Sequence, residues 1–112
     1  MKRSDVKAVL STVFNECLVL YDQGSSEYAE DADAFANFME DAREAGVSQE
    51  LVLSIFANKH WRGIRRWIKG HKSQRENVRG RLNDMIVYLG ILRAMADEAD
   101  EIARMDVMLN GK

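Results

Sequence analysis

The sequence predicts an all-α fold, a compact bundle of three long helices plus one short helix, in a single domain over residues 1–112. Apolar residues recur at helical spacing in four segments of the chain. There is no proline, which all-β domains commonly use in their turns. Hydrophobic residues make up 46% of the chain and charged residues 30%, which is typical of a globular domain.

The first two helices are expected at about residues 4–23 and 33–45. Ser4 is a favourable cap for the first helix. Gly24 and Gly46 are expected to end the two helices, because glycine is the usual residue just after a helix. The expected buried stripe of the first helix consists of Val6, Val9, Leu10, Val13, Phe14, Cys17, Leu20 and Tyr21. The expected apolar face of the short helix consists of Phe35, Phe38, Met39 and Ala42.

The two remaining helices are expected at about residues 48–70 and 73–108. Ser48 is a favourable cap for the third helix, and Ser73 and Glu76 have the spacing of a capping box for the fourth. The expected buried stripe of the third helix consists of Leu51, Val52, Ile55, Phe56, Ile64, Trp67 and Ile68. The expected buried stripe of the fourth helix consists of Val78, Leu82, Met85, Ile86, Leu89, Leu92 and Met95. The last turns of this helix are expected either to fray or to pack on another subunit.

The composition excludes several classes of protein. The single cysteine, Cys17, cannot form an internal disulfide, so a secreted disulfide scaffold is excluded. Its apolar neighbours favour a small core residue over a reactive thiol. There is neither an apolar run long enough for a signal peptide nor the roughly 20 apolar residues of a membrane span. We therefore expect a cytoplasmic protein with no membrane partner.

Charge is distributed unevenly along the chain. Residues 59–81 contain nine lysines and arginines against Glu76 alone, net +8, while the remaining residues carry seven basic and seventeen acidic side chains, net −10. This basic segment is a solvated face, a face that forms salt bridges to the acidic second helix and C-terminal tail, or a site for nucleotide phosphates. Nucleic-acid binding ranks below these, because Trp61 and Trp67 suit base stacking but the sequence pI of about 5.7 is low for such a module.

Lys59 and Asp84 are charged residues at positions where the helical pattern predicts a buried face. They form either a structural ion pair between the third and fourth helices, or a site in which Asp84 binds a divalent cation and Lys59 contacts phosphate. Glu40 and Glu44, at i and i+4 on the short helix, are either solvated surface or two further carboxylates for magnesium.

Other chemical motifs are missing from the sequence. His60 and His71 are lone histidines without the spacing of a zinc site. The sequence contains no glycine-rich phosphate loop, no G-x-S-x-G elbow and no support for a Cys–His nucleophile pair.

Four short sequence motifs follow one another between Tyr21 and Glu98, and their order and spacing are informative. They are Ser26-Glu27-Tyr28 before an acidic loop, Phe35-Ala36-Asn37-Phe38, Ile55-Phe56-Ala57-Asn58-Lys59-His60, and Arg81-Leu82-Asn83-Asp84-Met85-Ile86-Val87-Tyr88. In this order and spacing, about two thirds of the chain resembles the small phage-type members of the MazG-like all-α nucleoside triphosphate pyrophosphatase superfamily.

The resemblance implies Mg²⁺-dependent cleavage of a (deoxy)nucleoside triphosphate between its α and β phosphates, in a homo-oligomer. The partner is then a nucleotide or another phosphate-bearing small molecule. The candidate site residues are Asp84 and Lys59 for catalysis, Tyr28, Asn37, Arg62, Arg66 and Tyr88 for nucleotide binding, and Asp84, Glu40 and Glu44 for the metal.

The chain departs from the pattern of that superfamily in its acidic pairs. Its enzymes usually show E-x-x-E and then E-x-x-D, whereas this chain has Asp41-x-x-Glu44 as the nearest first pair and Arg81-x-x-Asp84 as the second. Three hypotheses therefore stay open: a pyrophosphohydrolase, a nucleotide-binding protein using Mg²⁺, and a non-enzymatic helical protein-interaction module, for example a phage-encoded modulator of a host factor.

Overall fold

The structure is a computed structural model that describes residues 1–25, 34–72 and 77–111. Its helices follow in the order α1 (Arg3–Ser25), α2 (Ala36–Ala45), α3 (Gln49–Ile68) and α4 (Val78–Asn110). No strand occurs in these residues. The prediction of an all-α fold with three long helices and one short helix is confirmed.

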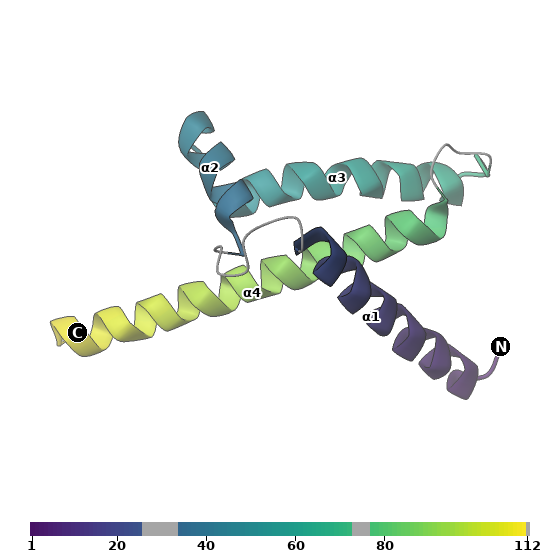
Figure 1. The fold of residues 1–112 in the computed structure, drawn as a ribbon, viewed down its shortest axis with the longest axis horizontal. Coiled ribbons are helices and arrows are strands. Elements are labelled where there is room, and N and C mark those ends of the chain that lie inside the picture. The colour runs from purple at the N-terminus through teal and green to yellow at the C-terminus, as the bar shows by residue number, and fades with distance from the viewer. Residues whose placement is uncertain (26–33, 73–76, 112) are drawn as a thin grey trace.

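The helices assemble around the pair formed by α3 and α4. In Figure 1, α3 runs beside the first half of α4, and α2 packs against the start of α3. Helix α1 begins away from α4 and crosses it with its C-terminal half. The core lies where α2, α3 and α4 meet. Its buried members are Phe35, Phe38, Ala42, Val52, Leu53 and Met95, with Met39, Tyr88, Ile91 and Leu92 packed against them.

Local sequence signals set the end of α2 and the start of α3, whereas α1 continues through Gly24, the stop predicted for it, to Ser25. The Ser48 hydroxyl oxygen accepts the backbone N–H of Leu51 at 3.1 Å, so the predicted cap of α3 is confirmed. Gly46 follows α2 at φ 70°, the left-handed conformation that glycine adopts without strain, and this prediction is also confirmed. Helix α1 starts at Arg3, so Ser4 lies inside its first turn instead of capping it.

Helix α4 begins at a different cap from the one predicted. Asn77 is the N-terminal cap, and its side-chain oxygen accepts the backbone N–H of Arg79 at 2.8 Å. The expected capping box at residues 73–76 lies outside the described residues, as does the acidic stretch 27–33. At the other end the helix continues to Asn110, beyond the predicted limit.

The buried face of α3 is rotated from the predicted one. The structure buries Val52, Leu53, Ala57, His60, Gly63 and Ile64. The predicted members Leu51, Ile55, Phe56, Trp67 and Ile68 are 37–61% exposed, and Lys59 is exposed as well. The prediction was wrong because α3 has apolar residues on more than one face, so the 3.6-residue period alone does not select the face that meets α2 and α4.

Two helical arms extend beyond the packed part of the molecule. We call residues 3–14 the N-terminal arm and residues 96–110 the C-terminal arm. Every residue from 1 to 12 and from 96 to 110 is exposed. The Cα radius of gyration is 17.4 Å, compared with about 13 Å for a compact domain of similar length. The core is therefore confined to the region where the helices cross.

Candidate functional site

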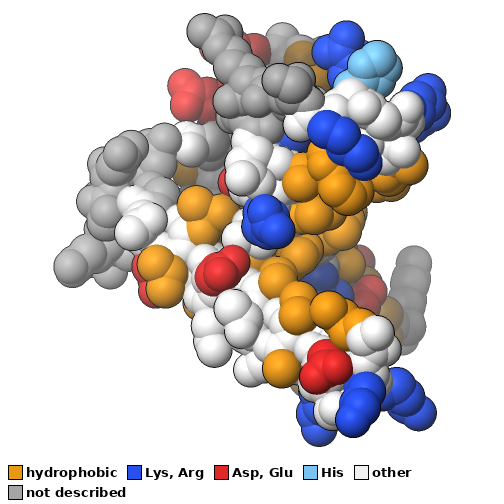
Figure 2. All heavy atoms as spheres, turned by 90° about the vertical axis from the view of Figure 1, so that its right-hand side faces the viewer, with side chains coloured by type: hydrophobic (Ala, Val, Ile, Leu, Met, Phe, Trp, Pro, Cys, Tyr) orange, Lys and Arg blue, Asp and Glu red, His pale blue; other side chains and the backbone are white. Residues whose placement is uncertain are grey.

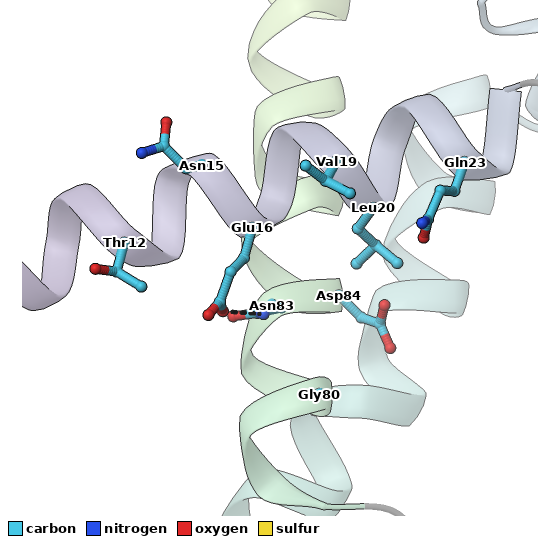
Figure 3. Close-up of a pocket in the computed structure, with 9 residues that line it drawn as sticks. All are labelled: Thr12, Asn15, Glu16, Val19, Leu20, Gln23, Gly80, Asn83 and Asp84. Atoms are coloured by element: carbon cyan, nitrogen blue, oxygen red, sulfur yellow. Dashed lines mark hydrogen bonds between the residues drawn. The ribbon is translucent and has the colours of Figure 1, made fainter.

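A groove lies where α1 crosses α4. It has a volume of about 690 Å³ and is shallow and largely open to solvent. Its lining consists of Thr12, Asn15, Glu16, Val19, Leu20, Gln23, Gly80, Asn83 and Asp84. Figure 3 shows Glu16 meeting Asn83 on one side of the crossing, and Leu20 standing beside Asp84 on the other. The groove thus combines side-chain amides, two carboxylates and two apolar side chains.

Asn83 joins α4 to α1 through two contacts. Its side-chain amide donates to the Glu16 carboxylate at 3.0 Å, and its backbone carbonyl accepts the thiol of Cys17 at 3.6 Å. Burial raises the pKa of the Cys17 thiol, and the negative charges of Glu16 and Asp84 raise it further. The thiol is thus held in its neutral, unreactive form, as expected for a small buried residue.

Asp84 also faces α3, where it meets a buried histidine. The Asp84 carboxylate lies 3.4 Å from Nδ1 of His60, and that nitrogen has no partner with hydrogen-bond geometry among the described residues. The His60 ring lies 5.7 Å from the ring of Tyr88, which is one helical turn after Asp84 on α4. Burial raises the pKa of Tyr88, and the charge of Asp84 raises it further. Asp84 therefore belongs both to the groove and to the α3–α4 contact.

Arg81 lies across α3 at the only position where that helix has a glycine. Its Nη1 donates to the carbonyl oxygen of Lys59 at 3.4 Å. A Cβ atom at Gly63 would collide with the Arg81 side chain. The glycine thus leaves room for the arginine between the two helices.

The predicted site residues are only partly brought together. Asp84 and Tyr88 lie on adjacent turns of α4 and face the same histidine. Lys59 does not approach Asp84: it is exposed, and the neighbouring residue His60 takes the place expected for it. The predicted ion pair between Lys59 and Asp84 is therefore wrong.

The predicted residues on α2 lie on its exposed surface. Asn37, Glu40 and Glu44 are all exposed, while Phe38 and Ala42 hold the helix to the core. The turn geometry of the helix places Glu40 and Glu44 opposite that buried face. The structure does not bring them to Asp84. Tyr28 lies outside the described residues.

Arg62 and Arg66 belong to a row of cations on the outer side of α3. Helical spacing places this row opposite the buried face of α3. We call it the outer basic stripe; it consists of Lys59, Arg62, Arg65, Arg66 and Lys69, all exposed. Within the described ranges, no carboxylate lies at ion-pair distance from these five side chains. Figure 2 shows blue basic side chains gathered at the top, around the end of α3.

The carboxylates of the groove suit a divalent cation better than those of α2. In the described part of the chain, no group of three histidine, cysteine or acidic side chains is close enough to hold a metal ion. Magnesium, however, is commonly held by one or two carboxylates, with water and substrate phosphates completing its shell. Asp84 and Glu16 both line the groove, but they lie on opposite sides of the crossing (Figure 3), so either would act there as a single carboxylate ligand.

Sequence reasoning missed His60, Glu16 and Asn83. His60 lies at the 4-3-4 spacing of the buried residues 53, 57, 60 and 64, a signal that was visible in the sequence. Glu16 and Asn83 gave no such signal, because nothing in the local sequence distinguishes them from other polar residues on helix surfaces. They become site residues only because α1 and α4 cross at their positions.

Comparison of the chain with protein-family models, curated proteins and solved structures found no match. Within the residues that the structure covers, no helix combines the length and apolar character needed to cross a bilayer.

Proposed function

We propose that the chain binds a nucleotide, or another phosphate-bearing small molecule, in the groove between α1 and α4. The placement of Asp84 is the observation that supports this most strongly. One carboxylate lines the groove and also contacts a buried histidine of α3. Pockets with a few convergent polar groups are the usual places for small molecules to bind.

The lining of the groove fits the uncharged parts of a nucleotide. Asn15, Gln23 and Asn83 offer both donors and acceptors, which is what the edge of a nucleobase or a ribose requires. Val19 and Leu20 offer apolar surface against which a base can pack. The volume of about 690 Å³ is large enough for a small molecule, which would stay partly exposed to solvent in so open a groove.

The phosphates would need a cation, because no lysine or arginine among the described residues lines the groove. We propose that Mg²⁺ bound by Asp84 fills this role, since it would neutralise phosphate oxygens beside that carboxylate. Hydrolysis between the α and β phosphates, in the cytoplasm, is the more specific form of the proposal, and it rests on the resemblance to MazG-like enzymes.

Titration calorimetry with a panel of dNTPs and Mg²⁺ tests the binding proposal. We expect Asp84→Asn to weaken binding at least about tenfold, because it removes a charged ligand. Asp100→Asn, the same change at an exposed position of α4, is the matched control and should bind normally. Absence of heat and of thermal stabilisation with every nucleotide would refute the proposal.

Release of pyrophosphate from the same panel separates enzyme from binding protein. Turnover that requires Mg²⁺ and disappears in Asp84→Asn supports a pyrophosphohydrolase. Binding without turnover supports a nucleotide-binding protein.

The outer basic stripe supports a second candidate, a non-enzymatic protein-interaction module. Five exposed cations on one helix face, none paired with a carboxylate of residues 1–25, 34–72 or 77–111, form a surface that attracts acidic partners. A phage-encoded modulator of a host factor is one form of this candidate.

Binding to poly-glutamate and to single-stranded DNA, measured by fluorescence anisotropy over a salt series, tests the stripe. Arg65→Glu with Arg66→Glu should abolish binding, while Asp84→Asn should retain it. A preference for poly-glutamate supports the protein-interaction module, and a preference for DNA indicates a nucleic-acid site instead. If neither probe binds in a salt-sensitive manner, the stripe is only a solvated face.

A further inference from the structure

The two arms are helices without a neighbour in the described part of the chain. The C-terminal arm has exposed Ile102, Met105 and Leu109, and the N-terminal arm has exposed Val6, Leu10 and Phe14. Isolated helices shorter than about 12–15 residues are marginal in water, and most helices in proteins are stabilised by packing of an apolar face. Each arm is the end of a longer helix, and its exposed apolar side chains are available for packing of this kind.

The apolar stripe of α4 continues from the core into the C-terminal arm without a change of spacing. Steps of four and three residues connect Tyr88, Leu92, Met95, Ala99 and Ile102; the next position of the stripe is Asp106, and Leu109 follows it. The first three contact or belong to the core, whereas those beyond residue 95 are exposed. This heptad spacing is that of helices that pair side by side.

The N-terminal arm shows the same continuity on α1. Steps of four and three residues connect Val6, Leu10, Val13, Cys17 and Leu20. Cys17 is buried at the crossing with α4, while Val6 and Leu10 are about half exposed. Both arms are therefore extensions of stripes that already pack inside the molecule.

The charges of the two arms are opposite. The N-terminal arm carries Arg3 and Lys7 against Asp5, net +1, and Lys2 adds a further positive charge immediately before it. Residues 96–110 carry five acidic side chains against Arg104, net −4. Each arm would repel a copy of itself and attract the other.

We propose that a second copy of this chain covers both arms, with the N-terminal arm of one protomer pairing with the C-terminal arm of its partner. A two-fold axis produces this contact twice, so both arms of both protomers are buried in one closed dimer. In Figure 1 the arms leave α4 toward opposite ends of the molecule, which prevents them from pairing within one chain. Figure 2 shows orange apolar side chains above the basic tip of α1, on the face that the partner would cover.

Charge reversal in each arm tests the pairing. The first variant is Arg3→Glu with Lys7→Glu, and the second is Glu98→Lys with Asp106→Lys. Sedimentation equilibrium from about 1 µM to about 1 mM gives the dimer dissociation constant. We expect the unaltered 12.8 kDa chain to double in mass, and each variant alone to dissociate at least about tenfold more readily.

An equimolar mixture of the two variants is the decisive sample. In a mixed dimer each basic arm meets an acidic arm again, so dimer formation should return to that of the unaltered chain. Met108→Glu, on the side of the C-terminal arm away from the stripe, is the control and should dimerise normally. Circular dichroism checks that all variants stay helical.

Three results would overturn the proposal. The first is a monomer at every concentration. The second is a dimer that ignores the Arg3 and Lys7 changes, since pairing of two C-terminal arms would not involve those residues. The third is a monomer that co-sediments with phosphatidylcholine–phosphatidylserine vesicles, which would identify lipid as the occupant of the arms.

Discussion

Asp84 influences three neighbours from a single position on α4. It contacts His60, and its charge raises the pKa of both Cys17 and Tyr88, in each case after the larger effect of burial. Its importance was predictable, because a carboxylate on an otherwise apolar helix face requires compensation. The identity of its partner was not predictable, because Lys59 and His60 are consecutive and point about 100° apart on α3.

We predict that Asp84→Asn lowers the pKa of Tyr88 toward its ordinary value without reaching it, because burial remains. The ultraviolet absorbance of tyrosinate, compared with that of Tyr88→Phe, isolates this residue among the three tyrosines. A pKa unchanged by Asp84→Asn would show that the carboxylate does not act on the phenol.

The same shift links folding stability to alkaline pH. The folded-state pKa of Tyr88 is raised, so its contribution to stability is complete below the unfolded pKa of about 10 and is lost as pH rises through the folded pKa. The free energy of unfolding should fall with pH in this window, less steeply in Asp84→Asn, and still less in Tyr88→Phe.

Gly63 and Gly90 form a matched pair for testing the packing of Arg81. We expect Gly90→Ala, where nothing lies within 4 Å of the new Cβ, to stabilise the protein by about 0.5–1 kcal/mol through helix propensity. Gly63→Ala should be about 1–3 kcal/mol less stable than Gly90→Ala, because the methyl group displaces the Arg81 side chain. Urea denaturation measures the free energy of unfolding of both variants. Equal free energies would mean that the Arg81 side chain moves aside without destabilising the protein.

At the scale of elements, the existence and the ends of the helices follow from local chemistry. Ser48, Gly46 and Asn77 act through hydrogen bonds within a few residues, so their effects are encoded nearby, although Asn77 was overlooked in favour of Ser73. The buried face of α3 is not encoded in this way. Its apolar residues occur on several faces, and only contact with α2 and α4 selects the one containing His60.

The cap of α3 gives a prediction at this scale. Ser48→Ala should destabilise the protein by about 1 kcal/mol, because the N–H of Leu51 loses its acceptor. Ser54→Ala should change stability by less than about 0.5 kcal/mol, because the Ser54 hydroxyl only donates to a carbonyl of its own helix. Chemical denaturation of the two variants measures the difference, and equal losses would rule out a specific role for the cap.

At the scale of the whole molecule, the sequence predicted the helix content but not which helix crosses which. The metal ligands expected on α2 illustrate this, because Glu40 and Glu44 have suitable spacing but lie on an exposed face. Glu16, which has no distinctive spacing, lines the groove because α1 crosses α4 there. Crossing positions depend on contacts between residues far apart in the chain, for which one sequence gives no local signal.

We predict that the thermal midpoint of the full chain rises with protein concentration, because a dimer stabilises the folded state by mass action. A chain ending at Asp97 should lack this dependence while still unfolding cooperatively, since no residue from 96 to 110 is buried. Differential scanning calorimetry over a hundredfold concentration range measures both. A midpoint independent of concentration in the full chain would contradict the prediction.

The attachment of α1 has a consequence for the order in which the molecule opens. The backbone of α1 approaches α4 alone among the described helices, and its buried anchor is Cys17. Detachment of α1 therefore leaves the α2–α3–α4 core intact, so α1 should form a separate cooperative unit of low stability. Amide hydrogen exchange should show α1 exchanging at a lower opening free energy than the centre of α3.

Because α1 forms one wall of the groove, the same opening event would dismantle the proposed binding site without unfolding the protein.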